Sequence, residues 1–386
     1  MPASSPYSPQ VLSWLARLGA TLPFAQAAAL LAELTGLLVS AATLRRHTEA
    51  LGAAAVAQEE DLVARLERDL PAPPAGPDRL VFGADGALVP LVGGEWAEVK
   101  LMSLGEPVAV APPGTAAPTV RPTALSYFAR LMDAETFGRQ VLGEMRRRGV
   151  ETARAVASVQ DGALWLQGVV DLHRPDATRI LDFAHAVMHL TALTEALFGV
   201  QTPRARQAAA RLRGWLWSQG PDRVLAVLAA WARARADCPA VEREVAYFTQ
   251  RRLHLDYPAF RAAGWPVGSG ATESGHKQIM QARMKRAGMR RARAQVNPLL
   301  ALSLLERNHR WPTDGPLLLH AHRVRSTHRR RARQHARRLV RPLPLTAPST
   351  TLPAPRTATS CLPSRPPAPP APHPWRRYGA PLSVKT

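Results

Sequence analysis

The sequence predicts an α/β protein: a mixed sheet flanked by helices, with an all-α insertion, a helical N-terminal region and a disordered basic C-terminal tail. Residues 80–183 contain strand-like and helical segments in the order strand, strand, strand, helix, strand. Residues 184–260, in contrast, show only helical spacing of apolar side chains. The chain has 50 Lys and Arg against 29 Asp and Glu, a formal charge of +21. Such an excess points to a polyanionic partner, with nucleic acid ahead of an anionic membrane.

Composition excludes several classes of protein. No apolar run is long enough to span a bilayer, and the first residues lack the basic-then-apolar order of a signal peptide. We therefore expect no membrane partner and a cytoplasmic, nucleoid-associated protein. The two cysteines, Cys238 and Cys361, are too few for a disulfide framework or a zinc cluster. Both are expected to be free thiols.

Residues 1–70 form the helical N-terminal region. A turn at Gly36 precedes Ser40, which is a good N-cap for the segment AATLRRHTEAL. Helix, Gly-containing turn and capped helix is the order of a helix-turn-helix, whose second helix enters the major groove of DNA. Small helical domains that bind no DNA share this pattern, so a plain helical domain remains the alternative. The side chains expected to face DNA are Thr43, Arg46 and His47.

A proline-rich linker at residues 71–79 separates this region from the first part of the core, residues 80–183. Its composition favours extended chain over helix. Within the core, a tight turn is expected at Asp85 and Gly86. The expected elements are strands at Arg79–Ala84, Ala87–Val92 and Trp96–Leu104, a helix at Asp133–Arg148, and strands at Ala153–Val159 and Ala177–Phe183.

Two acidic residues end expected strands. Asp85 follows the first strand and Asp161 the fourth, which is where α/β sheets place their ligands. If these strands pair in parallel through the helical crossover, both aspartates reach one edge of the sheet. Two acids side by side repel unless a cation lies between them, which favours a metal site. The alternative is that each Asp-Gly pair is an ordinary turn.

The fifth strand leads into a segment with two histidines. His185 stands three positions after Asp182 and His189 four positions after His185, so the two histidines share a helix face. A zinc site of the metalloprotease type is disfavoured, because Ala186 occupies the place of the required Glu. The helical insertion, residues 184–260, follows.

The last part of the core, residues 261–314, contains a third acid, Glu273. Glycines and Pro266 break regular structure before it, and a helix is expected from Thr272 onward. A carboxylate at a helix N-terminus is held ionised and can face a cation, although an ordinary solvated Glu remains the alternative. A phosphate loop is excluded because His276 separates the last glycine from the lysine. The cationic surface expected on this helix consists of Lys277, Arg283, Lys285 and Arg286.

The C-terminal tail, residues 315–386, contains no acidic residue and is rich in Pro, Arg, Ser and Thr. Its last 66 residues carry 14 Lys and Arg, so only +7 of the +21 charge lies on the rest of the chain. The tail has too few large apolar groups to offset its ordering entropy. We expect it to be disordered or bound along DNA phosphates.

Three long segments together resemble the ISKra family of bacterial insertion-sequence transposases. They are ADGALVPLVGGEWAEVK around Asp85, VQDGALWLQGVVDLHRPDATRILDFAHAVMHL around Asp161 and GWPVGSGATESGHKQIMQARMKRAGM around Glu273. The similarity covers most of residues 80–311. The chain departs from the family at Arg291, where Trp is usual.

The resemblance implies an RNase H-like catalytic domain with a DDE triad of Asp85, Asp161 and Glu273. Asp85 would bridge two Mg²⁺ ions, for which Mn²⁺ is a substitute, and the other two acids would each hold one ion. The three carboxylates should then meet in space. Asp182 and His185 are similar to the Asp-x-x-His signature of related Mutator-like transposases, and are expected to be structural or to contact DNA.

The activity implied by the resemblance is Mg²⁺-dependent DNA strand cleavage and strand transfer at insertion-sequence ends. The expected partner is double-stranded DNA, bound by a homodimer or a larger assembly. A non-catalytic, sequence-specific DNA-binding protein, including an inactive transposase copy, is the main alternative. It would explain the charge but not three acids at element ends. An RNase H-like nuclease, which would cleave DNA without strand transfer, is a further alternative.

Overall fold

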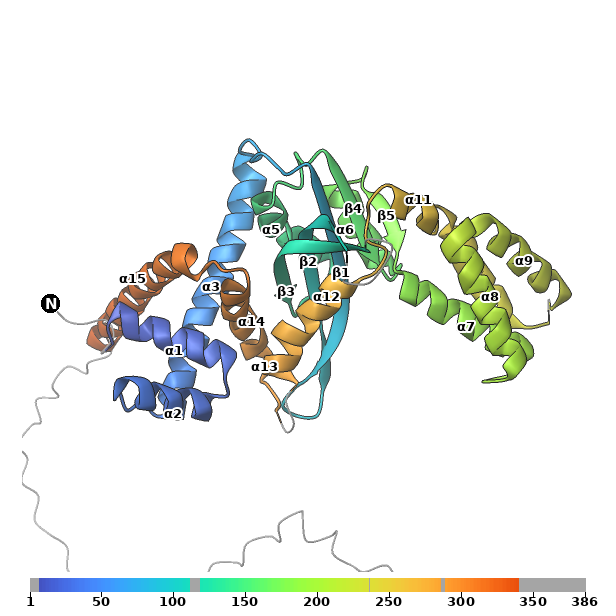
Figure 1. The fold of residues 1–386 in the computed structure, drawn as a ribbon. Coiled ribbons are helices and arrows are strands. Elements are labelled where there is room, and N and C mark those ends of the chain that lie inside the picture. Colours follow the sequence, from blue (N-terminus) through green and yellow to red (C-terminus); the bar gives the residue numbers. More distant parts are fainter. Residues whose placement is uncertain (1–6, 112–118, 236, 286–288, 340–386) are drawn as a thin grey trace, which may run out of the picture. The chain divides into compact units, whose positions relative to one another are not determined.

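The computed structural model describes residues 7–111, 119–235, 237–285 and 289–339 (Figure 1). Residues up to Arg333 form one compact unit, which contains all the strands of the described residues, and a second unit starts at Gln334. No helix in these ranges is long and apolar enough to cross a membrane.

A five-stranded mixed sheet is the centre of the first unit. Its strands are β1 (Arg79–Pro90), β2 (Trp96–Val110), β3 (Thr119–Arg130), β4 (Ala155–Gln160) and β5 (Thr178–Leu181). The strand order is β3-β2-β1-β4-β5, with β2 antiparallel to both β1 and β3, and β4 parallel to both β1 and β5. The sheet is open and flanked by helices, which confirms the predicted α/β class and is compatible with an RNase H-like core.

The strands expected at Arg79–Ala84 and Ala87–Val92 form one strand, β1, so the turn expected between them is wrong. β1 continues through Asp85 and Gly86, which both remain paired with β2. The chain reverses instead at residues 91–95, where Gly93 and Gly94 adopt positive φ values of 94° and 90°. Glycine accepts this conformation without a steric cost. An Asp-Gly pair therefore stays extended here because a long neighbouring strand pairs with it.

The sequence did not predict β3, and Ala87–Val92 is not a separate strand. β3 lies at the edge of the sheet, and most side chains in its first half are exposed. Pro122 lies within it, which an edge strand tolerates because one row of its N–H groups needs no partner. The strand therefore lacks the apolar alternation that identifies a half-buried strand in a sequence.

Helices cover both faces of the sheet (Figure 1). Phe82 packs with Phe137 on one face, whereas Leu101 packs with Ile279 on the other. Asp85 pairs with Leu101 and lies on that second face. The first face is covered by α4 (Ala134–Gln140), α5 (Leu142–Arg147) and α6 (Leu164–His173), and the second by α12 (Gly270–Gly275), the π-helical turn η2 (His276–Gln281), α13 (Ala282–Met284) and α14 (Arg293–Arg307).

Three helices precede the sheet: α1 (Pro9–Thr21), α2 (Phe24–Thr35) and α3 (Ala41–Asp69). Ser40 caps α3 as predicted, because its hydroxyl accepts a hydrogen bond from the Thr43 N–H at 3.1 Å. The helix is longer than expected. Gly52 lies so close to α14 that a Cβ would collide with the Pro298 carbonyl. The N-terminal helices also share a buried cluster with α14, so they belong to the same compact unit as the sheet.

The all-helical insertion is present between β5 and α12. Its elements are α7 (Phe183–Phe198), α8 (Pro203–Gln219), α9 (Pro221–Ala234), α10 (Pro239–Gln250), the short η1 (Arg252–His254) and α11 (Tyr257–Ala262). Leu190, Leu216 and Phe248 of the insertion share a buried cluster with Val81 of β1 and Val159 of β4. The insertion and the sheet therefore share one core.

The tail predicted after the core begins as a helix, so the expectation of disorder from residue 315 is wrong for its first part. α15 spans Trp311–Leu339. Trp311 and Leu318 are buried in the cluster formed with α1, and Trp311 Nε1 donates a hydrogen bond to Ser13 Oγ at 2.9 Å. These two apolar anchors and the good helix propensity of Arg and Leu explain the helix. Residues 340–386 lie outside the described residues.

Candidate active site

Asp85 lies on β1, and Asp161 directly follows β4, the parallel neighbour of β1. β1 pairs with β4 up to Phe82, which is opposite Ser158, 76 positions later. Asp161 also follows Asp85 by 76 positions, so the two aspartates would be level if this register continued for three residues beyond the last pair. Asp161 is the first residue after β4, as predicted, whereas Asp85 lies inside β1 rather than at its end.

Each aspartate already has a local partner. Asp85 Oδ1 accepts a hydrogen bond from the Gly86 N–H at 2.6 Å, and Asp161 Oδ1 accepts one from the Ala163 N–H at 2.9 Å. The Tyr247 hydroxyl donates to the Asp161 carbonyl oxygen at 2.8 Å. Both aspartates are half-buried. In each aspartate, the hydrogen bond from the backbone N–H occupies only one carboxylate oxygen. Both side chains can therefore still accept a further ligand.

Glu273 lies in the first turn of α12, as predicted, and is exposed. The helix is held against the sheet by its neighbour Thr272, whose Oγ1 is 2.8 Å from Ser103 Oγ of β2. A Cβ on Gly83 of β1 would lie only 2.9 Å from Thr272 Oγ1. Glycine at this position therefore permits the close approach of α12 to the strand that carries Asp85.

Asp182 ties the segment before α12 to the start of α7. Its Oδ1 accepts a hydrogen bond from the His185 N–H at 2.7 Å, which caps α7, and its Oδ2 accepts one from the Ser269 N–H at 2.6 Å. Asp182 is buried. One carboxylate therefore fixes both the beginning of the insertion and the N-cap residue of α12. In this structure the Asp-x-x-His motif has a structural role.

His276, which the sequence analysis did not select as a functional residue, connects the Glu273 helix to Asp85. Its Nε2 lies 3.2 Å from Asp85 Oδ2, and its Nδ1 lies 3.0 Å from Met280 Sδ. His276 is 8% exposed, and its Nε2 is close to Asp85 but poorly aligned for a hydrogen bond. Its position three residues after Glu273, on the same side of a helix, is the sequence signal that could have identified it.

The three carboxylates do not form a preassembled metal site. Among the described residues, no group of three or more His, Cys, Asp or Glu side chains could hold a metal ion. The donor chemistry nevertheless suits Mg²⁺, which prefers carboxylate oxygens and retains several water ligands rather than requiring an all-protein cage. The buried, poorly satisfied Nε2 of His276 beside Asp85 also agrees with a further ligand in this place.

The cationic surface predicted on the Glu273 helix is only partly present. Lys277 and Lys285 are exposed, and Arg286 lies outside the described residues. The prediction for Arg283 is wrong, because its side chain is buried and its Nε and Nη2 donate to the Gly19 carbonyl at 3.1 and 2.9 Å. Arg283 follows the buried Ile279 by four positions and the buried Met280 by three, so helical spacing places it on the buried side of the helix.

The residues predicted to face DNA from the N-terminal region lie in the first turns of α3. Arg46 is exposed. The Thr43 hydroxyl accepts a hydrogen bond from Ser40 Oγ at 3.0 Å, so it takes part in the helix cap. His47 is half-buried with its ring centroid 5.2 Å from that of Tyr7, and burial, followed by the charge of Arg46, lowers its pKa. Of the three, Arg46 is the most accessible to a polyanion.

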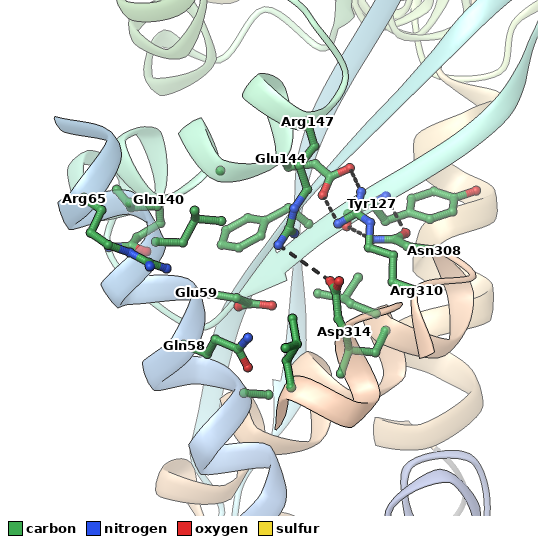
Figure 2. A pocket seen from close by; sticks show the side chains of 18 residues that line it. Gln58, Glu59, Arg65, Tyr127, Gln140, Glu144, Arg147, Asn308, Arg310 and Asp314 are labelled. Atoms are coloured by element: carbon green, nitrogen blue, oxygen red, sulfur yellow. Dashed lines mark hydrogen bonds and ion pairs between the residues drawn. The ribbon is translucent and has the colours of Figure 1, made fainter. Parts of the chain in front are cut away.

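A cavity of about 210 Å³ lies between α3, β3, α5, α14 and α15 (Figure 2). Its charged side chains bind one another. Arg310 makes two hydrogen bonds of 2.5 Å to the Glu144 carboxylate, and Arg147 lies 3.6 Å from Asp314. Because these pairs satisfy much of the polar lining, the cavity is a junction between helices and not a candidate active site.

In comparisons with known proteins, no family model matches this chain, and no curated protein matches it.

Proposed function

We propose that this protein is a metal-dependent DNA transposase of the DDE type, which cleaves DNA at the ends of an insertion sequence and joins those ends to new DNA. One observation carries the proposal: β1, which contains Asp85, pairs in parallel with β4, which ends one residue before Asp161, and the helix that carries Glu273 lies over β1. The strand order β3-β2-β1-β4-β5 supports an RNase H-like core, and the resemblance of three segments to the ISKra family supports the reaction.

The roles of the residues follow from this proposal. Asp85, Asp161 and Glu273 would hold two Mg²⁺ ions, or Mn²⁺ in their place, with Asp85 as the ligand that both ions would share. When bound, the metal supplies an activated water or 3′-hydroxyl and stabilises the charge of an in-line phosphoryl transfer. Lys277 and Lys285, which are exposed on or beside the Glu273 helix, contact backbone phosphates.

The partner proposed for the protein is double-stranded DNA, bound by a homodimer or larger assembly in the nucleoid. The +21 charge of the chain supports a polyanion. So does α15, whose sequence after Asp314 contains Arg and His but no acidic residue.

Glu273→Gln tests the proposal. The amide keeps the shape of the side chain but is a poor ligand for a hard cation, so cleavage of a duplex that carries the flanking repeat should be lost in Mg²⁺. DNA binding should persist, and the free energy of unfolding should change by about 0.5 kcal/mol or less. Glu242→Gln is the matched control, because Glu242 is also exposed in the first turn of a helix, α10, outside the site. Normal cleavage by Glu273→Gln would refute the assigned role.

A non-catalytic DNA-binding protein is the second candidate, favoured by the capped helix α3 and the basic helix α15. It predicts that the wild-type protein binds the repeat duplex but never cleaves it. A pre-cut repeat end then distinguishes a transposase from a nuclease, because only a transposase joins that end to a second DNA molecule.

A further inference from the structure

A second cavity, of about 640 Å³, opens beside the segment that leads into α12. Its walls come from β3, α8, α11 and α12 with the preceding loop. Among the described residues, its lining includes two Arg and two Trp but no Asp or Glu, whereas three acidic residues line the cavity of Figure 2. The residues that matter here are Arg121, Trp217, Arg261, Trp265, Gly270 and Ser274.

Arg261 and Trp217 form a fixed planar stack at this cavity. The Arg261 guanidinium carbon lies 3.9 Å from the Trp217 ring centroid, and its Nη2 donates to the Trp217 carbonyl oxygen at 2.9 Å. The Phe183 ring lies 4.7 Å from that of Trp217. Arg261 is exposed. A guanidinium held in this way presents a flat cation, and such a surface stacks on nucleic-acid bases as well as on aromatic rings.

We propose that this cavity binds one unpaired nucleotide of the DNA, with its base on the Arg261–Trp217 stack. The absence of acidic lining residues means that nothing in the wall repels the attached phosphate, and Arg121 attracts it. Ser274 lines the cavity and follows Glu273 directly, so the cavity adjoins the helix that carries Glu273. This inference rests on the proposed function. It adds that the substrate is a DNA end with an unpaired base. Such a base can enter the cavity without the free-energy cost of separating it from a paired and stacked partner.

A binding experiment without metal tests the cavity. Anisotropy of a labelled duplex in EDTA is compared for a blunt end and for the same end with a two-nucleotide overhang. The wild-type protein should bind the overhang roughly tenfold more tightly, as expected for one stacked base. Gly270→Leu should remove that preference and leave blunt-end binding unchanged, because a Cβ at Gly270 meets no atom within 4 Å and the longer side chain can extend into the cavity.

Arg261→Lys separates stacking from charge. It keeps the cation but loses the planar group, so the preference for the overhang should fall several-fold while blunt-end binding stays the same. Arg223→Lys is the matched control: Arg223 stacks on Trp215 at the same 3.9 Å but lies outside the cavity lining, and this change should have no effect.

Equal wild-type affinity for the two duplexes would overturn the inference. So would a parallel loss of blunt-end and overhang binding in Gly270→Leu with its thermal unfolding unchanged. The outcome is independent of cleavage, since no metal is present. If the protein prefers the overhang but does not cleave DNA, the nucleotide site is supported and only the proposed transposase activity is refuted.

Discussion

His276 is the single residue that joins the Glu273 helix to Asp85 among the described contacts. If it orients that carboxylate, His276→Gln should lower the cleavage rate by about 10–100-fold, the usual effect of removing a group that positions a metal ligand. The variant should also need a higher Mg²⁺ concentration for half-maximal rate, which a purely structural role would not require. Met280→Leu is the control, because it removes the sulfur contact and leaves the imidazole in place. An unchanged rate and metal requirement in His276→Gln would exclude the positioning role.

Two nearby cations should behave in opposite ways. Arg283→Met should lower the free energy of unfolding by about 1–3 kcal/mol, because the buried Gly19 carbonyl loses its donors, without changing the DNA affinity of the folded protein. Lys285→Ala should leave unfolding by urea unchanged but weaken DNA binding equally for all sequences, and should reduce the salt slope by about one. Loss of DNA affinity in folded Arg283→Met would contradict the buried role.

Residue types alone identified part of the candidate site. Asp85, Asp161 and Glu273 could be proposed because each is an acid at the expected end of a strand or helix, although Asp85 lies inside β1 in the structure. His276 could not be selected in this way, since its significance depends on an approach to Asp85 across 191 positions. The burial of Arg283, in contrast, could have been predicted, because Arg283 shares a helix face with the apolar Ile279 and Met280.

At the scale of elements, the Glu144–Arg310 pair connects α5 to the residue before α15. The Glu144 side chain is only 3% exposed, whereas the Arg17–Glu306 pair, which has the same two-bond geometry, has side chains that are 46% and 35% exposed. Glu144→Gln should therefore cost about 3–5 kcal/mol of unfolding free energy, since it leaves a buried guanidinium uncompensated. The matched change Glu306→Gln should cost about 1 kcal/mol or less. Urea unfolding of both variants checks this, and equal costs would refute it.

Elements whose conformation depends on residues close in the sequence could be predicted. The cap at Ser40 and the helices of the insertion are encoded locally, by side-chain chemistry and apolar spacing. The extended conformation of Asp85 and Gly86 depends on pairing with β2, and the helix α15 depends on the burial of Trp311 against α1. These contacts join distant parts of the chain, so local preferences predicted a turn and a disordered tail instead.

At the scale of the whole molecule, charge is unevenly distributed. Residues 334–386 carry eight Lys and Arg and no acidic residue, so deleting them leaves +13 of the +21 charge. The deletion should weaken DNA binding and reduce the slope of log Kd against log salt by up to about 7, while sequence preference survives. A deletion that starts at residue 334 keeps the part of α15 up to Arg333, which belongs to the first unit.

A full-length variant with those eight cations replaced by Gln is the control for chain length. It should match the deletion if charge alone matters. An unchanged salt slope in both proteins would show that this segment makes no phosphate contacts.

The two ends of the insertion meet at a single point. The Phe183 N–H donates to the Val267 carbonyl at 2.9 Å, although the two residues are 84 positions apart. In evolutionary terms, the intervening gene segment could be gained or exchanged as a cassette without changing the register of the sheet. Without the insertion, Val81 and Val159 would be exposed to solvent, because both pack on it. An ancestral core without the cassette would need polar residues at these two positions, or another cover for them.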